Sequence, residues 1–281
     1  MTHSGPSEPP LDDDGKMSAR SVEAIRDYWQ ERPLGTQYVS DRDVTPGSAE
    51  FFQHIKPWMN PYKFPEIMPR IEAEAAKLRG GHLLEIGCGM GFDSAEFLER
   101  GVRVTATDLT RSAVQLARRH FATRGVRAEA VRVENVLRLS FPDETFDAVW
   151  ANGVVHHTGD SRAAIAEIRR VLRPGGRAII SNFYRKPSWM LLLSRLGREN
   201  IEFEDADPPV TDFMREREIL DLFDGFEIES ASRDHYRALP IARRGWKAAL
   251  YTWGFRPVYN LLPVALAQRF AYKLSVTAVK R

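Results

Sequence analysis

The sequence predicts an α/β fold in which a mostly parallel β-sheet carries helices on both faces. The first observation behind this prediction is the alternation of short apolar runs with segments of helical periodicity from residue 83 onwards. The second is composition, because a chain of 281 residues that is 43% hydrophobic and 28% charged can bury a full core.

Each expected strand is a short apolar run bounded by turn residues, and each expected helix has apolar positions three or four apart. The helix that follows Asp108 closes at Gly125, in a C-cap position. Strands are expected at 83–86, 102–107, 127–133, 146–151, 177–183, 226–230 and 274–279. Helices are expected between them at 93–99, 111–123, 161–172 and 216–223.

Composition divides the chain into three parts. Residues 1–17 are rich in Ser, Pro, Asp and Gly and are predicted to form a disordered tail. Residues 18–80 space their apolar side chains as helices do, and they are predicted to form a helical N-terminal cap. Residues 81–281 hold the alternating elements and form the main domain. Three prolines are expected to break the later helical stretch of the cap: Pro57, Pro61 and Pro65.

Cysteine content and hydropathy exclude several classes of protein. Cys88 is the one cysteine, so the chain forms no intramolecular disulfide and no zinc site built on several cysteines. The N-terminus lacks the apolar run of a signal peptide, and the charge-free stretch 257–268 is too short to span a bilayer as a helix. We expect a cytoplasmic protein, with peripheral contact to a membrane as an open alternative.

Two stretches, 184–212 and 234–272, fall outside the alternation and are predicted to be lid insertions near the ligand-binding edge of the sheet. The second is basic, because residues 233–281 contain ten Lys or Arg residues and a single acid, Asp234. Three interpretations stay open: a lid whose aromatic side chains line an apolar pocket, an element that meets an anionic membrane, or a nucleic-acid contact. Nucleic acid is the least favoured, because no recognised RNA-binding module accompanies the segment.

Three glycines at alternate positions follow the first strand and open a helix: Gly87, Gly89 and Gly91. Glycine lets the backbone turn sharply and lets a ligand approach closely, so this loop is a candidate nucleotide site. The dinucleotide spacing fails, because its third glycine would fall on Phe92, and no P-loop lysine follows. Asp108 ends the second strand, where an acid typically accepts hydrogen bonds from ribose hydroxyls. The same residue also fits a helix N-cap.

The pattern Glu85-x-Gly87-x-Gly89-x-Gly91, followed by Asp108 and by Leu-Arg-Pro-Gly-Gly at 172–176, resembles the class I S-adenosylmethionine-dependent methyltransferases. Residues 141–149 and 152–157 resemble that family's fourth-strand motif and the loop after it. Residues 28–36 resemble a subgroup of bacterial small-molecule methyltransferases. The resemblance implies a Rossmann-like sheet of seven strands, with S-adenosylmethionine as cofactor.

The resemblance also implies individual roles around the cofactor. The glycine loop would pass beneath its methionine part, and Glu85 would order the loop or reach the amino group through water. Asp108 would bind both ribose hydroxyls, and Leu109 would pack on the adenine. Asn135, next to Val136, stands where the family usually has Asp at the adenine edge, and its side-chain oxygen can still accept a hydrogen bond.

Further cofactor contacts are expected from the loops and the cap. Asn152 follows the fourth strand, and Tyr62 and Lys63 of the cap would cover the cofactor with a basic group near its carboxylate. Cys88 lies within the glycine loop, where it is either a reactive thiol or, more simply, a small residue that fits a tight turn.

The adjacent histidines His156 and His157 are the candidate catalytic residues. Either could remove the acceptor's proton, because histidine titrates near neutrality, and His157 is the marginally better candidate. The alternative is that both shape the loop and pack against the sheet. We predict no metal site, since neighbouring side chains in an extended segment point apart.

The predicted function is transfer of a methyl group from S-adenosylmethionine to an O, N or C nucleophile of a small, largely apolar acceptor, such as a secondary metabolite or a lipid-linked molecule. Such chemistry needs mainly alignment and exclusion of water, which is consistent with the lack of a convincing catalytic triad. Two alternatives remain: a non-catalytic S-adenosylmethionine-binding regulatory or scaffold protein, and an NAD-dependent oxidoreductase.

Overall fold

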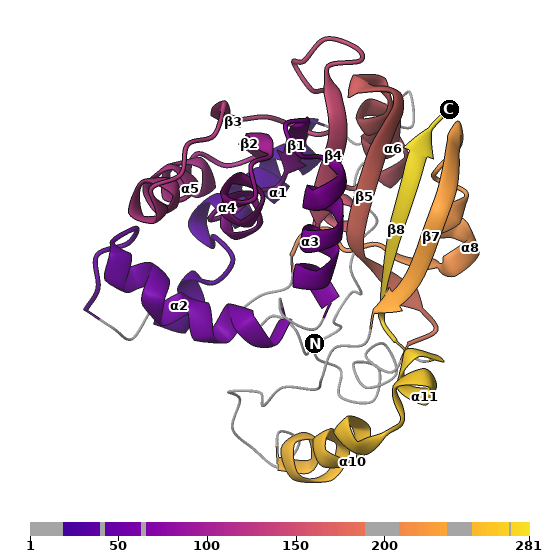
Figure 1. Cartoon of the computed structure of the whole chain (residues 1–281). Coiled ribbons are helices and arrows are strands. Elements are labelled where there is room, and N and C mark those ends of the chain that lie inside the picture. The colour runs from indigo at the N-terminus through magenta and orange to yellow at the C-terminus, as the bar shows by residue number, and fades with distance from the viewer. Residues whose placement is uncertain (1–18, 40–42, 63–65, 189–207, 235–248, 270) are drawn as a thin grey trace.

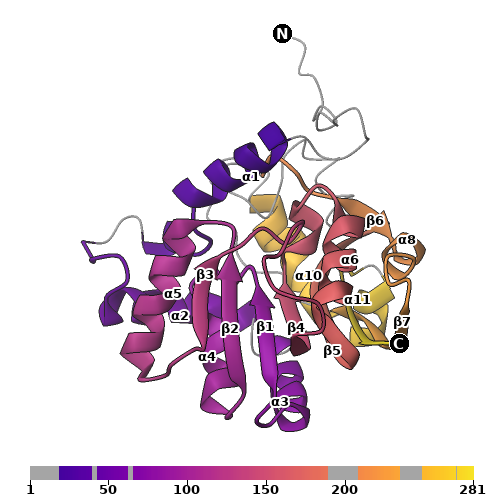
Figure 2. The ribbon, with the colours of Figure 1, turned by 90° about the horizontal axis from the view of Figure 1, so that it is seen from above.

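The apolar strands assemble into one open, twisted sheet with helices on both faces (Figures 1 and 2). The computed structural model describes residues 19–39, 43–62, 66–188, 208–234, 249–269 and 271–281. Along the sheet the strands follow the order β3-β2-β1-β4-β5-β8-β7, and β6 pairs with β5 beside this path. All pairings are parallel except those of β8, which runs antiparallel to both β5 and β7. The predicted mostly parallel sheet is confirmed, and it has eight strands where the sequence predicted seven.

The strands match the predicted apolar runs, with three main differences, at β3, β5 and β7. The strand β7 continues to Asp234, beyond the predicted end at residue 230. The third strand is shorter than predicted and the fifth is longer at both ends, while β6 is a short eighth strand that the sequence did not suggest. The strands are β1 (His82–Ile86), β2 (Arg103–Asp108), β3 (Ala130–Val133), β4 (Phe146–Asn152), β5 (Leu172–Lys186), β6 (Phe213–Arg215), β7 (Phe226–Asp234) and β8 (Lys273–Lys280).

Both faces of the sheet are buried, so the central strands are apolar on both sides. One face packs on α3 (Met68–Lys77), α4 (Phe92–Glu99) and α5 (Arg111–Arg124) through a core that includes Phe97 and Trp150. The other packs on α6 (Ser161–Val171) and α8 (Glu216–Leu220) through a core that includes Phe146 and Phe183. Short helical turns η1 (Thr36–Val39) and η3 (Val155–His157) lie in the connections.

The cap differs from the prediction at its prolines. The helix α2 (Ala49–Tyr62) runs through Pro57 and Pro61 instead of ending before them. Its N-terminal half is held by tertiary contacts, because Phe51, Phe52 and Ile55 pack with Met90 and Leu116 in a core of their own. The packing of this half outweighs the missing backbone hydrogen bond of a proline inside the helix.

The first helix, α1 (Ala19–Glu31), is fastened to the N-terminus of α5 (Figure 2). The Gln30 side-chain oxygen accepts from the backbone N–H groups of Arg111 (2.9 Å) and Ser112 (3.3 Å). The Ser112 hydroxyl donates in return to the Gln30 carbonyl, at 3.0 Å. These bonds satisfy N–H groups that the start of a helix leaves unpaired, and they fix α1 beside the carboxyl ends of the strands.

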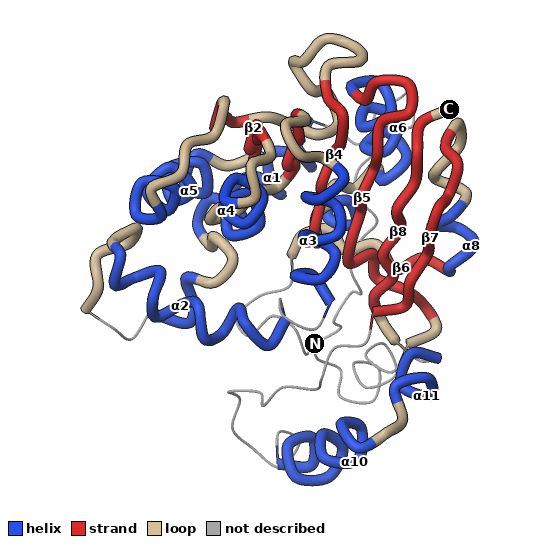
Figure 3. The backbone as a smooth tube through the Cα atoms, in the orientation of Figure 1, coloured by secondary structure: helices blue, strands red, loops and turns tan. Residues whose placement is uncertain are grey.

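The connection between β7 and β8 leaves the sheet at its carboxyl edge, since Asp234 and the end of β5 both pair with the start of β8 at Lys273. Its described part forms η4 (Leu250–Phe255), α10 (Arg256–Leu261) and α11 (Val264–Arg269), which lie beyond the ends of β5 and β7 (Figure 3). The predicted tail at 1–17, and 189–207 and 235–248 of the predicted lids, lie outside the described residues. No described helix has the length and hydropathy needed to cross a bilayer.

The glycine loop between β1 and α4 turns sharply at Gly91, the N-cap of α4, where φ is +74°. A β-carbon at Gly91 would lie 2.6 Å from the Phe121 ring of α5, a distance that real side chains do not reach. Gly91 therefore lets α4 and α5 pack together as well as letting the chain turn.

We predict that Gly91→Ala lowers the free energy of unfolding by more than backbone strain alone. The left-handed backbone costs alanine about 1–2 kcal/mol. Crowding against Phe121 adds roughly 1–3 kcal/mol. Gly125→Ala is the matched control, because Gly125 also has positive φ (+65°) but a β-carbon there meets nothing within 4 Å. Urea unfolding followed by tryptophan fluorescence measures both, and equal losses would contradict the packing role.

Candidate functional site

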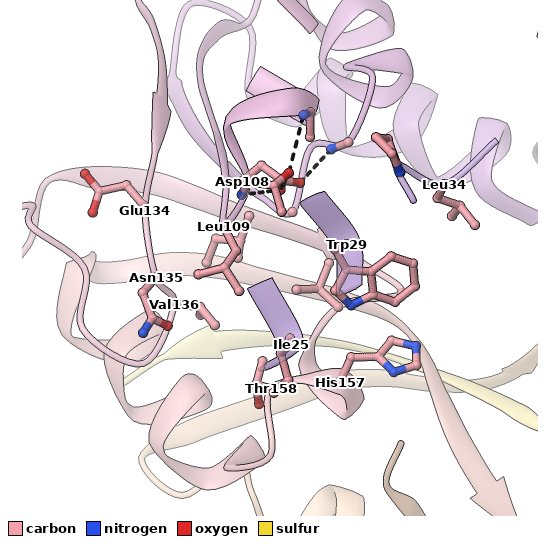
Figure 4. Close-up of a pocket in the computed structure, with 18 of the residues that line it drawn as sticks. Ile25, Trp29, Leu34, Asp108, Leu109, Glu134, Asn135, Val136, His157 and Thr158 are labelled. Atoms are coloured by element: carbon pink, nitrogen blue, oxygen red, sulfur yellow. Dashed lines mark hydrogen bonds between the residues drawn. The ribbon is translucent and has the colours of Figure 1, made fainter. Parts of the chain in front are cut away.

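A mostly apolar pocket of about 950 Å³, including the space at its mouth, opens where β1, β2 and β4 end (Figure 4). The strand order reverses between β1 and β4, and such switch points are where open α/β sheets bind ligands. The helix α1 closes the pocket from outside with Val22, Ile25 and Trp29.

Asp108 holds the pocket's wall together at the end of β2. One carboxylate oxygen accepts from the Gly89 backbone N–H at 3.0 Å. The other accepts from the N–H and hydroxyl of Thr110, at 2.9 and 2.8 Å. Burial raises the pKa of the Asp108 carboxyl above its usual value, and these hydrogen bonds counteract part of that rise. The predicted ribose-binding residue therefore lines the pocket and also ties the glycine loop to the start of α5.

The glycines of the loop have different surroundings. A β-carbon at Gly87 would lie 2.3 Å from the Val154 side chain, so this position has no space for one. A β-carbon at Gly89 would meet nothing within 4 Å, although Gly89 lines the pocket and has φ of +52°. The open space beside Gly89 suits a ligand lying directly against the backbone. Together with Asp108 it fits the ribose and methionine portions of S-adenosylmethionine.

Two residues predicted to contact the cofactor point away from the pocket. Glu85 is buried behind the loop, where its carboxylate accepts from the Ser94 hydroxyl of α4. Cys88 packs in the core with Ala95 and Phe121. Burial, with Asp108 and Glu85 nearby, raises the pKa of the Cys88 thiol well above its usual value. Cys88 is thus a small core residue that stays protonated, and Glu85 is placed to order the loop.

Leu109, Asn135 and Val136 line the pocket, as expected for an adenine site. Leu109 packs with Ile25 and Trp29 of α1. The Asn135 side-chain oxygen accepts from the Leu137 backbone N–H at 3.0 Å, so one of its two lone pairs is used within the loop. Asn135 therefore offers its amide N–H groups and the second lone pair to a bound base.

Asn152 reaches the pocket from the end of β4 within a polar network that sequence reasoning missed. Its amide donates to the Asp93 carboxylate at 3.0 Å, and its oxygen accepts from Asn182 of β5. The Trp150 indole N–H donates to the same Asp93 oxygen at 3.1 Å. Asp93 opens α4 directly after the glycine loop, so this network ties the loop to the ends of β4 and β5. No motif in the sequence indicated it.

His157 lines the pocket, and its ring lies edge-on to Trp29 with centroids 5.5 Å apart (Figure 4). Its Nδ1 lies 2.9 Å from the Val210 carbonyl oxygen. A carbonyl can only accept, so Nδ1 carries the proton and Nε2 carries the basic lone pair. Val210 belongs to the predicted first lid, which therefore orients the candidate base.

His156 lies outside the pocket and is 1% exposed. Its ring packs between His157 and Tyr184, with centroids 4.0 and 4.2 Å away. Nε2 has no hydrogen-bond partner among the residues that the structure describes. Burial above all, and then His157 and Lys273, lower the pKa of His156 well below its usual value. His156 is neutral and shapes the loop, so His157 alone remains a candidate base.

The expected basic contact from the cap is not formed by the described residues. Tyr62 ends α2, but its side chain, like the whole of Lys63, lies outside the description. Arg32 stacks on Tyr28 instead of lining the pocket. The cap contributes an apolar wall, and the i, i+4 spacing of Ile25 and Trp29 was the sequence signal for it.

Comparison with known proteins agrees with this geometry. Residues 84–180 match the family model described as a methyltransferase domain. The ubiquinone biosynthesis O-methyltransferase of Xanthomonas oryzae pv. oryzae is 32% identical over 144 residues, which are 51% of this chain and 57% of that protein. The malonyl-acyl-carrier-protein O-methyltransferase of Serratia marcescens is 37% identical over 102 residues, 36% of this chain and 38% of that protein.

The chain thus spans little more than half the length of the first of these relatives. Magnesium protoporphyrin IX methyltransferase from Synechocystis, solved with S-adenosylhomocysteine, aligns over 92% of this chain and 99% of that one. Its TM-score is 0.57 at 16% identity, a likeness that shows the fold alone. The family match covers the glycine loop, Asp108 and the end of β4, which build the pocket. Residues 84–180 thus form a methyltransferase domain that resembles the class I S-adenosylmethionine-dependent enzymes, and S-adenosylmethionine is the cofactor that such a domain takes.

Proposed function

We propose that this protein methylates an oxygen nucleophile on a small, largely apolar acceptor. The observation that carries the proposal is that one pocket contains both Asp108, suited to the ribose, and His157, suited to a proton transfer. The O-methyltransferase names of the matched relatives support oxygen over nitrogen or carbon. The apolar wall from α1 supports an acceptor with little charge.

The residues of the pocket would hold and orient the cofactor. S-adenosylmethionine supplies an electrophilic methyl group on a sulfonium. Asp108 accepts from the ribose hydroxyls, and the Gly89 backbone leaves room for close contact. Leu109, Ile25 and Val136 would exclude water around the adenine of the cofactor. Catalysis then depends mainly on alignment of the acceptor oxygen with the methyl group and on exclusion of water from the site.

His157 would take the acceptor's proton at Nε2. The Val210 carbonyl fixes the tautomer, and the Trp29 edge limits rotation of the ring. A protonated His157 would keep its Nδ1–H bond to Val210, so the ring need not move between states. His157 is thus placed to accept the proton as the oxygen gains its methyl group.

We predict that Asp108→Ala weakens binding of S-adenosylhomocysteine by roughly 10- to 100-fold, because hydrogen bonds to a charged group contribute about 1.5–3 kcal/mol. Isothermal titration calorimetry measures the loss. Thr110→Val is the control, since it removes one of the internal hydrogen bonds of Asp108 without touching the proposed ribose contact. An equal loss in both variants would mean that Asp108 acts only on the loop. Binding of NAD but not S-adenosylhomocysteine by the wild type would overturn the function itself.

We predict that His157→Gln lowers turnover about 100-fold or more, as loss of general base catalysis does, while affinity for S-adenosylhomocysteine changes little. Release of S-adenosylhomocysteine is measured with a panel of apolar phenols and carboxylic acids. Wild-type binding without turnover of any acceptor or cell extract would favour the non-catalytic alternative. Unchanged turnover in the variant would remove His157 from the chemistry but leave the methyl transfer standing.

We predict that His156 makes the protein less stable as pH falls below about 6.5, the ordinary histidine value. Its folded pKa is depressed, so the unfolded state binds more protons there, and the free energy of unfolding falls by up to about 1.4 kcal/mol per pH unit. His156→Phe should flatten this part of the profile, measured by urea unfolding between pH 5 and pH 8, the range in which histidine changes charge. An unaltered slope in His156→Phe would contradict the assignment.

A further inference from the structure

Apolar side chains gather on the outer surface of η4, α10 and α11. Nine large hydrophobic residues are exposed in the described parts of the chain, and six of them lie here. Trp253 is 79% exposed and Leu261 is 84% exposed. This apolar face comprises Leu250, Trp253, Val258, Leu261, Val264 and Leu266. An exposed cluster of this kind marks a contact with another molecule, whereas scattered exposed residues do not.

The inner side of η4, α10 and α11 packs against other residues. The exposed side chains of the apolar face therefore belong to a folded segment. Tyr259 and Ala267 are 4% and 1% exposed, and the Phe255 and Tyr259 rings stack with centroids 5.3 Å apart. The buried guanidinium of Arg185 donates to the Ala271 and Arg269 carbonyls, at 3.1 and 2.9 Å. These bonds fasten the end of α11 to β5. The segment therefore buries Tyr259 and Ala267 while it leaves Trp253 and its larger aliphatic side chains in water.

The segment that carries the face has only positive charge in its own sequence, and Glu216 is an acid that lines a surface hollow with Ala265 and Arg269 of α11. In sequence, residues 235–272 contain six Arg or Lys residues and no Asp or Glu. Arg256 and Arg269 belong to the described helices of the segment. Like charge disfavours a second copy of the same face, and aliphatic side chains do not stack on nucleic-acid bases. Apolar side chains with an exposed tryptophan and flanking cations match the interface of an anionic bilayer.

The face also lies at the carboxyl edge of the sheet, beyond the ends of β5 and β7 (Figures 1 and 3). We propose that η4, α10 and α11 form a peripheral docking surface for an anionic lipid bilayer. Trp253 and Leu261 enter the headgroup layer, and Arg256 and Arg269 meet lipid phosphates. The inference rests on exposure and charge, and it does not depend on the methyl-transfer proposal.

The test is co-sedimentation of the full chain with vesicles of phosphatidylcholine, alone or mixed with phosphatidylglycerol, at low and moderate salt. The wild type is expected to bind the anionic vesicles, and more weakly as salt rises. Trp253→Ser/Leu261→Ser should reduce binding about tenfold or more for each residue removed from the bilayer. Ile228→Ser on β7 is the matched control, because it removes an exposed aliphatic residue outside the face.

A second variant tests the charges with the apolar face intact. Arg256→Gln/Arg269→Gln should reduce the preference for phosphatidylglycerol and the dependence on salt. Affinity for S-adenosylhomocysteine and the melting temperature should stay at wild-type values in every variant. Equal binding to neutral and anionic vesicles, or no binding to either, would overturn the proposal. So would a dimer in light scattering that Trp253→Ser/Leu261→Ser dissociates, because the occupant would then be a second copy.

Discussion

The hydrogen bonds of one carboxylate, that of Asp108, support the rest of the binding pocket. They join three elements that are separate in sequence: the glycine loop after β1, the end of β2 and the start of α5. Each donor is a group that a turn or a helix start would otherwise leave unpaired. The same carboxylate lines the pocket, so the residue that organises the loop also presents its charge to the ligand.

Two further contacts complete the site from distant parts of the chain. Gln30 of α1 accepts hydrogen bonds from backbone N–H groups at the start of α5, the same helix start that Thr110 caps. Two side chains, one from α1 and one from the end of the β2 loop, therefore hold the start of α5. The α1 helix then brings Trp29 to the His157 ring, whose tautomer is fixed by Val210. Trp29 and Val210, which are far apart in the sequence, thus meet at the ring of His157. The proposed chemistry depends on this convergence, because no single segment contains both the cofactor contacts and the base.

The carboxyl edge of the sheet gathers the chain's interaction surfaces for a topological reason. The parallel strands all end there, so the loops after β1, β2 and β4 converge on the pocket. β8 is antiparallel and begins at the same edge, so the connection from β7 must also lie there. The apolar face of η4, α10 and α11 and the candidate cofactor pocket therefore share one edge of the molecule.

The sequence by itself determined the sheet and the outline of the site. Apolar runs marked seven of the eight strands of the sheet, and the glycines and Asp108 marked a loop that lines the pocket, because backbone conformation and strand ends are local properties. The neighbours of each side chain were decided only by the tertiary structure. Cys88 turns into the core, His156 is buried while His157 reaches the pocket, and Asp93 joins Asn152 across the loop.

The course of α2 and the exposure of the basic segment between β7 and β8 were also decided only by the tertiary structure. Packing of the first half of α2 carries that helix through prolines that local propensity would have used to end it. The sequence showed the positive charge between β7 and β8, but the outward direction of Trp253 and Leu261 followed from how Tyr259 and Ala267 pack inward. Charge and periodicity can be read directly from the sequence, whereas the burial of a side chain depends on residues far apart in sequence that only the fold brings together.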